Sequence, residues 1–170
     1  MTPEEVLSHP SSVLTRDQRQ FYFENGWLLL EKIVPAKWNE RLRAAAAKIV
    51  HATRSMTQSS PAIEVMPDHT ADHPLVSLVS SPEDLQPAFW EFLSGSILTD
   101  VVCDLLGPGA RFRWAALPFK VAGPVDPWHQ DMVYDLLDGA GLFAGIHLHD
   151  CGPRQARLML IPGSHRGELF

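Results

Sequence analysis

A histidine and a carboxylate lie two residues apart in the sequence Pro-Trp-His-Gln-Asp at positions 127–131. Because alternate residues of an extended strand point to the same face, we expect His129 and Asp131 to project side by side. An imidazole and a carboxylate are two of the three protein ligands of a 2-His-1-carboxylate iron site, which leaves positions open for an oxidant and a co-substrate. A His-x-Asp sequence is common by chance, so this spacing alone is a weak indication of a metal site.

The composition is that of an ordinary globular protein. The chain has 170 residues, 45% hydrophobic and 20% charged, and its size predicts a single domain over residues 1–170. The net charge of −6 argues against a nucleic-acid partner, which requires clustered Lys and Arg. No apolar run is long enough to span a membrane. The first ten residues do not resemble a secretory signal, so we expect a cytoplasmic protein with Cys103 and Cys151 reduced.

Helix signals dominate the first part of the chain. Thr15 and Gln18 form a capping box at the start of a short helix that Gly26 is expected to end. Residues 36–52 are amphipathic and predict a longer helix. Its apolar stripe consists of Trp38, Leu42, Ala45 and Ile49. Two more helices are expected at 87–93 and 97–106, and the apolar run at 27–33, which lacks a helical period, predicts a strand.

A long polar loop is expected at residues 54–74, with a short strand at 62–66 inside it. His69 and His73 stand beside Asp68 and Asp72, which suggests a metal cluster. Pro74 and the polar surroundings favour a solvated loop instead.

From residue 111 onward the pattern changes to short extended runs separated by turns. The extended runs are expected at 111–115, 119–122, 142–149 and 158–161. Short strands at even spacing indicate an antiparallel sandwich or barrel. The sequence therefore predicts an α+β domain that is mainly β, with a helical N-terminal part at 1–110 and a β part at 111–170.

Two motifs together carry a family resemblance. Trp-His-Gln-Asp at 128–131 is followed by Ile-Pro-Gly-Ser-His-Arg-Gly at 161–167. The chain resembles the phytanoyl-CoA dioxygenase-like family of non-haem iron(II), 2-oxoglutarate-dependent oxygenases, in which a His-Gln-Asp strand and a Pro-Gly-Ser/Thr-His-Lys/Arg-Gly turn lie about this far apart. Residues 21–30 and 105–108 are also similar to the family's opening segment and to the loop before its first core strands.

The resemblance implies a double-stranded β-helix, the cupin-like jelly roll, with helices packed on one sheet. It implies that His129 and Asp131 are iron(II) ligands and that Gln130 lies near the co-substrate. Lys120 matches a position that contacts 2-oxoglutarate in some members, and the alternative is an ordinary surface lysine. Ser164 and His165 belong to the turn and are not ligands. The implied function is an iron(II)/2-oxoglutarate-dependent dioxygenase that hydroxylates a small-molecule substrate, since a halogenase would need the metal position that Asp131 occupies. The substrate and the oligomeric state stay open.

The chain departs from the family pattern in two ways. The family's second iron histidine and its 2-oxoglutarate arginine follow the Pro-Gly-Ser-His turn, whereas this sequence stops at Phe170. We therefore expect a jelly roll truncated at its C-terminus, a fragment of a longer protein. The alternatives are that another component supplies the missing part, or that the chain is an inactive paralogue acting as a binding or regulatory module.

The second departure is His147, which stands where family members often carry an aromatic residue. His147 and His149 share a face of the expected strand, so either of them could supply the missing imidazole, or both could line the co-substrate pocket or the outer face of the sheet. A third reading is a cupin-like metalloprotein that binds zinc or another metal through His129, His147 and His149.

Overall fold

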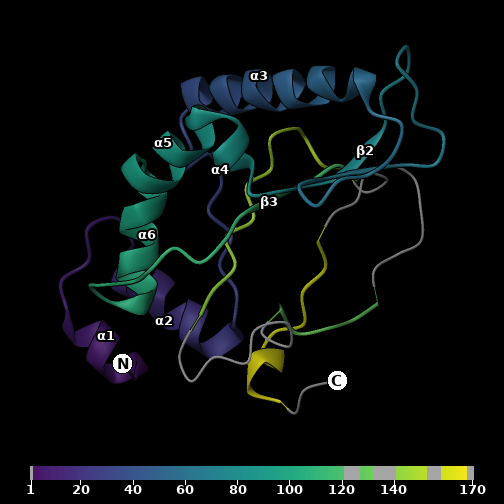
Figure 1. Ribbon diagram of the computed structural model, residues 1–170. Helices are drawn as coiled ribbons and strands as arrows, with labels where there is room; N and C mark the ends of the chain where they lie inside the picture. The colour runs from purple at the N-terminus through teal and green to yellow at the C-terminus, as the bar shows by residue number, and fades with distance from the viewer. Residues whose placement is uncertain (1, 121–126, 132–140, 153–157, 168–170) are drawn as a thin grey trace.

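A long helix, α3 (Ala36–Ala52), lies across the molecule above a small β-sheet (Figure 1). The other helices lie between α3 and the place in the structure where the chain begins. The computed structural model describes residues 2–120, 127–131, 141–152 and 158–167. The remaining helices of this part are α1 (Pro3–Ser8), α2 (Arg16–Asn25), α4 (Pro82–Leu85), α5 (Pro87–Gly95) and α6 (Ile97–Leu106). Short 3₁₀ turns are η1 (Thr53–Ser55) and η3 (Ser164–Arg166), and the strands are β1 (Ile63–Val65), β2 (Val76–Ser80) and β3 (Ala116–Pro118).

The sheet is antiparallel, with β2 between β1 and β3. Val79 of β2 pairs with Ile63 on one side and with Leu117 on the other, and its side chain is fully buried. The strand predicted at residues 62–66 is confirmed as β1. Because β3 lies beyond residue 110 and pairs with β2, the predicted helical and β parts share this sheet.

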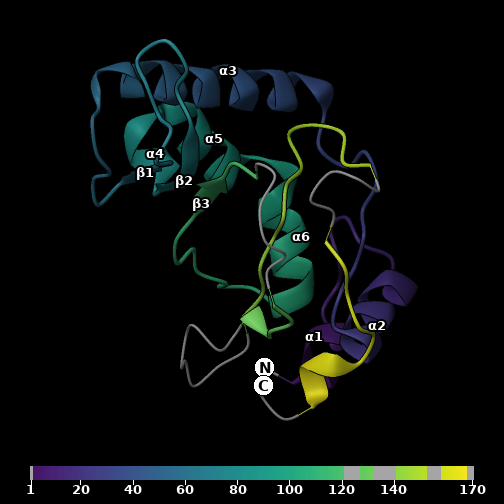
Figure 2. The same cartoon turned by 90° about the vertical axis from the view of Figure 1, so that its right-hand side faces the viewer.

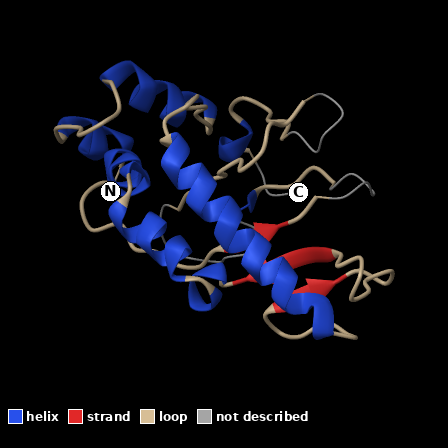
Figure 3. Cartoon of the chain, turned by 90° about the horizontal axis from the view of Figure 1, so that it is seen from above, coloured by secondary structure: helices blue, strands red, loops and turns tan. Residues whose placement is uncertain are grey.

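The main core forms where α3 packs on the sheet and on α5 (Figure 3). The predicted stripe is confirmed, since Leu42, Ala45 and Ile49 are buried against Val76 and Val79 of β2. Burying each large aliphatic side chain contributes about 1.5–3 kcal/mol. This packing fixes α3 over the sheet.

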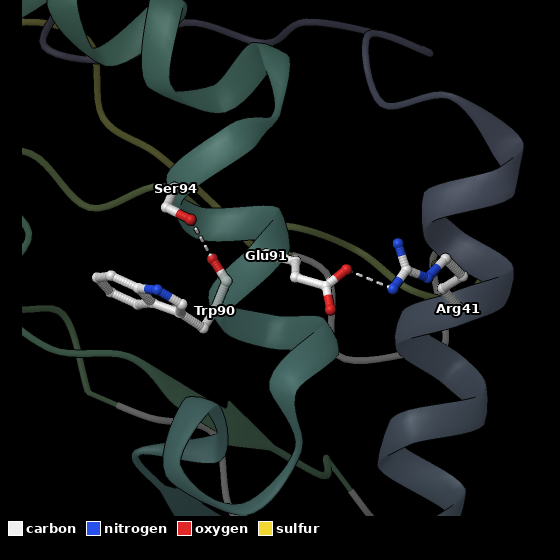
Figure 4. A network of polar contacts seen from close by, with 4 residues as sticks. All are labelled: Arg41, Trp90, Glu91 and Ser94. Carbon is white, nitrogen blue, oxygen red and sulfur yellow. Dashed lines mark hydrogen bonds and ion pairs between the residues drawn. The ribbon is translucent and has the colours of Figure 1, made fainter.

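Polar and aromatic contacts add to the packing of α3 on α5. Arg41 Nη2 lies 2.6 Å from Glu91 Oε2 (Figure 4). The Arg41 guanidinium also stacks 4.7 Å from the centre of the Trp38 ring. The Trp38 ring meets Phe92 edge to face at 5.4 Å. Because both partners of the ion pair are half-exposed, it contributes at most about 1 kcal/mol. Apolar burial therefore dominates this contact.

A buried carboxylate joins the N-terminal helices to α6. Asp104 accepts hydrogen bonds from the backbone N–H groups of Ser12, Val13 and Leu14, each at 2.8 Å. The buried Arg19 donates from Nε to the Asp104 carbonyl at 2.9 Å and also bonds the carbonyls of α1. This junction was not predicted from the sequence, although an aspartate on the apolar side of a helix was a signal for it.

The first helix signals are confirmed, but the strand predicted after them is wrong. The Thr15 capping box is present, and Gly26 ends α2 in the left-handed conformation. Residues 27–33 form no strand; Leu28 and Leu30 pack into a second apolar cluster while Leu29 stays 67% exposed. The run is apolar because it packs on α6, not because it belongs to a sheet.

The jelly roll is not confirmed, and the described residues contain more helix than strand. The strand predicted at 111–115 is wrong, because β3 begins at Ala116. Residues 142–149 and 158–161 run without strand pairing in the described part of the chain. Residues 119–120 of the run predicted at 119–122 are not in a strand, and residues 121–122 lie outside the described residues.

The loop at residues 54–74 is tied to the end of α3. His69 uses both ring nitrogens on backbone groups: Nδ1 accepts from Leu75 N–H at 2.9 Å, and Nε2 lies 2.9 Å from the Thr53 carbonyl. Since a carbonyl only accepts, Nε2 carries the proton. His69 is therefore a structural tie.

Within the described residues, no helix combines the length and the apolar character needed to cross a membrane.

Candidate metal centre

The paired imidazole and carboxylate lie side by side, as their spacing predicts. His129 Nε2 is 3.3 Å from Asp131 Oδ1, although residues 127–130 are not part of a strand. The side chains are 34% and 56% exposed, so solvent reaches both. Two neighbouring ligands at about 2.1 Å from one metal ion lie about 3 Å apart, so this separation fits a shared cation.

A backbone carbonyl sets the orientation of the imidazole. His129 Nδ1 lies 2.8 Å from the Pro127 carbonyl. Because that oxygen can only accept, Nδ1 carries the proton, and in the neutral ring the lone pair is on Nε2, which faces Asp131. Metal-binding histidines use the same arrangement, in which the second ring nitrogen donates to a carbonyl or carboxylate. The donor set therefore fits two positions of a metal site.

The residue between the pair ties this segment to the second motif. Gln130 Nε2 donates to the Ser164 carbonyl at 2.6 Å. Its Oε1 is buried and accepts no hydrogen bond from the described residues. The predicted role of Gln130 near the co-substrate stays a prediction, and in this structure it connects the two motifs.

The Pro-Gly-Ser-His-Arg-Gly segment docks on the C-terminal end of α2 (Figure 2). Gly163 N–H donates to the Asn25 carbonyl at 2.8 Å, and His165 Nε2 donates to the Phe23 carbonyl at 3.1 Å. Arg166 donates to the Glu24 carbonyl. The last carbonyls of a helix have no partner within it, so η3 acts as a cap supplied from far along the chain. His165 has a structural role in this contact.

The two remaining histidines face away from the core. Leu142, Ile146 and Leu148 pack inward, whereas His147 and His149 are exposed, so the two imidazoles do share one side of the run. His147 Nδ1 lies 3.1 Å from Cys151 Sγ. Within the described residues no three His, Cys, Asp or Glu side chains lie close enough to hold a metal, so neither histidine completes the His129–Asp131 pair there.

Lys120 is exposed and is the second residue after the end of β3. The next residues, 121–126, lie outside the described part of the chain. Its contact with 2-oxoglutarate stays a prediction.

Comparison with known proteins agrees with the motifs. A family model described as phytanoyl-CoA dioxygenase matches residues 22–170. A curated relative from Caenorhabditis elegans, named "Probable phytanoyl-CoA dioxygenase", is 25% identical over 173 residues. The match covers 94% of this chain and 55% of that protein, so the chain spans about half the length of the relative. No solved structure matches.

Proposed function

Because the chain belongs to the phytanoyl-CoA dioxygenase family, we propose that it provides His129 and Asp131 as two ligands of the metal site of an iron(II)- and 2-oxoglutarate-dependent dioxygenase. The observation that carries this proposal is the 3.3 Å separation of His129 Nε2 and Asp131 Oδ1. The carbonyl of Pro127 supports it by directing the Nε2 lone pair toward the carboxylate.

Each residue of the segment has a separate task in the proposed reaction. His129 and Asp131 hold iron(II), and the Gln130–Ser164 bond fixes the backbone between them. With 2-oxoglutarate and oxygen, bound iron supplies the oxidising power to hydroxylate a carbon of a small molecule. Lys120 would place its ammonium group against a carboxylate of 2-oxoglutarate, and His147 would line the same pocket.

The test measures iron and succinate separately on the protein expressed from its complete reading frame. We expect the wild type to retain iron(II) and to convert 2-oxoglutarate to succinate, while His129→Ala and Asp131→Ala lose iron. His149→Ala is the matched control, because it removes an exposed imidazole outside the pair and should keep iron. Iron retention and full turnover in both site variants would refute the assignment of the ligands.

A binding or regulatory module is the alternative function, and the same protein distinguishes it. Anaerobic calorimetry measures binding of iron and 2-oxoglutarate, and an oxygen electrode measures turnover. Binding of both without oxygen consumption across candidate substrates favours the module, and oxygen consumption excludes it.

A further inference from the structure

A second candidate site lies on α3, away from the His129–Asp131 pair. A hollow of ≈ 390 Å³ opens between α3 and the segments at Pro74, Phe119 and His149. In Figure 1 the yellow-green segment 141–150 rises to the underside of α3, and Figure 2 shows the same approach from the side. None of the residues proposed to bind iron lines this hollow, which we call the α3 pocket.

The register of α3 explains its lining. Residues four apart share a helix face, so Arg43 and Ala47 are followed by His51, and Ala46 and Val50 by Arg54 just beyond the helix. The helix thus presents small apolar side chains in the middle of the pocket and basic groups at its ends. The adjacent stripe, which contains Leu42 and Ile49, is buried in the core.

Backbone carbonyls hold both guanidinium groups in place. Arg43 Nε donates to the Leu148 carbonyl, and Arg54 Nη1 donates to the Ala71 carbonyl. The other guanidinium nitrogens make no hydrogen bond or ion pair with the described residues. Each arginine therefore keeps donors for a ligand while one bond limits its motion.

The charge of the pocket is of one sign. The described residues that line it include Arg43, Arg54, His51 and His149 but no Asp or Glu, although the whole chain carries a net charge of −6. Ala46, Ala47, Val50 and Phe119 supply an apolar wall. A pocket of this volume with a few polar groups on an apolar lining is typical of small-molecule sites.

We propose that the α3 pocket binds a compact organic anion with an apolar body, such as an aryl carboxylate. The anionic group bonds the free guanidinium donors of Arg54 at one end of the pocket, and Arg43 adds positive charge at the other end. The body rests on the wall formed by Ala47, Val50 and Phe119. The proposal is independent of the iron site, because it uses none of the same residues.

The experiment compares three probes of similar shape on the protein expressed from its complete reading frame: 1-naphthoate, neutral 1-naphthylmethanol and cationic 1-naphthylmethylamine. Fluorescence titration should give saturable binding of naphthoate with a Kd on the order of 0.1–1 mM, the range expected for a ligand of this size. The neutral and cationic probes should bind at least about tenfold more weakly, because they lack the charge-assisted bonds.

Variants locate the binding. Ala47→Leu fills the pocket from an exposed helix position and should weaken naphthoate binding about tenfold or more, whereas Ala44→Leu, on the same helix outside the lining, should not. Arg54→Gln should weaken it about tenfold through the lost charged donor, and Lys48→Gln is the control for removing one positive charge from α3. Absence of saturable binding, equal binding of the three probes, or unchanged binding in both Ala47→Leu and Arg54→Gln would overturn the proposal.

Discussion

Gly26 joins α2 to the second motif, and replacing it by alanine tests how that motif is held. Gly26 ends α2 with φ of +82°, and the His165 ring packs directly over it. The same turn carries the Ser164 carbonyl that accepts from Gln130. A side chain at position 26 therefore disturbs the docking of η3 as well as the helix end.

The cost has two parts. A β-carbon in the left-handed region destabilises the fold by about 1–2 kcal/mol. That carbon would lie 2.3 Å from His165 Nδ1 and 2.9 Å from His165 Cβ, so both the ring and its backbone must move. Moving them breaks the 3.1 Å bond to the Phe23 carbonyl, which is worth about 1 kcal/mol. We expect Gly26→Ala to lower the free energy of unfolding by about 2–3 kcal/mol.

Urea denaturation measures this loss of stability. Alanine variants of two other glycines separate the contribution of the backbone conformation from that of the contact with His165. Gly109 has φ of +90° and no atom near an added β-carbon, so Gly109→Ala should show only the backbone part, about 1–2 kcal/mol. Gly95 is equally open and lies at the end of α5 without a positive φ. Gly95→Ala should leave stability unchanged or raise it by up to about 1 kcal/mol.

The comparison between Gly26→Ala and Gly109→Ala tests whether the His165 ring restricts position 26. If both variants lose the same free energy, the His165 ring does not restrict position 26. A larger loss for Gly26→Ala, reduced when His165 is also replaced by alanine, supports the contact.

Two further predictions concern polar ties. Burial raises the pKa of Asp104, but the backbone N–H groups of Leu14, Ser12 and Val13 and the Arg19 charge outweigh it and lower the pKa below its ordinary value. The stabilisation by the Asp104 carboxylate is therefore present above about pH 4 and is lost as the pH falls through the lower folded pKa. Asp104→Asn should lower the free energy of unfolding, measured by urea denaturation at pH 7, by about 3 kcal/mol. The difference between Asp104→Asn and wild type should shrink in acid. Gln130→Leu removes the donor to the Ser164 carbonyl and should weaken iron binding about tenfold in a metal titration of the protein expressed from its complete reading frame. Gln20→Leu, on the exposed face of α2, is the control and should leave iron affinity unchanged. Equal iron affinities of Gln130→Leu and wild type would show that the Gln130–Ser164 bond does not position the ligands.

Local signals predicted α2, α3, α5 and α6, whereas the short helices α1 and α4 were not predicted. Thr15 with Gln18 and the left-handed Gly26 determine both ends of α2 within a few residues of sequence. The 3.6-residue period of α3 likewise identified Leu42, Ala45 and Ile49 as its buried side. Strands depend on partners elsewhere in the chain, so apolar runs alone predicted them poorly: residues 27–33 pack on α6 without pairing.

In the candidate site too, contacts between nearby residues were predicted from the sequence and contacts between distant segments were not. The spacing of His129 and Asp131 predicted that their side chains would be neighbours, and they are, although the strand on which the prediction was based is not present there. The Gln130 tie to Ser164 joins residues 34 positions apart, and Asp104 reaches Ser12 across 92 positions. No periodicity encodes such contacts.

Three stretches that are separate in the sequence meet at one place in the structure: the end of α2, the turn of the second motif and the His-x-Asp segment. The carbonyls at the end of α2 accept hydrogen bonds from Gly163 and, within η3, from His165 and Arg166. The Ser164 carbonyl accepts a hydrogen bond from Gln130. Gly26 is required because a side chain there would collide with the His165 ring. Gln130 stands between the two proposed ligands. Hydrogen bonds therefore connect the end of α2 to the turn, and the turn to the His-x-Asp segment. The turn therefore contributes to the proposed iron site through backbone geometry, with its own side chains used on the carbonyls of α2.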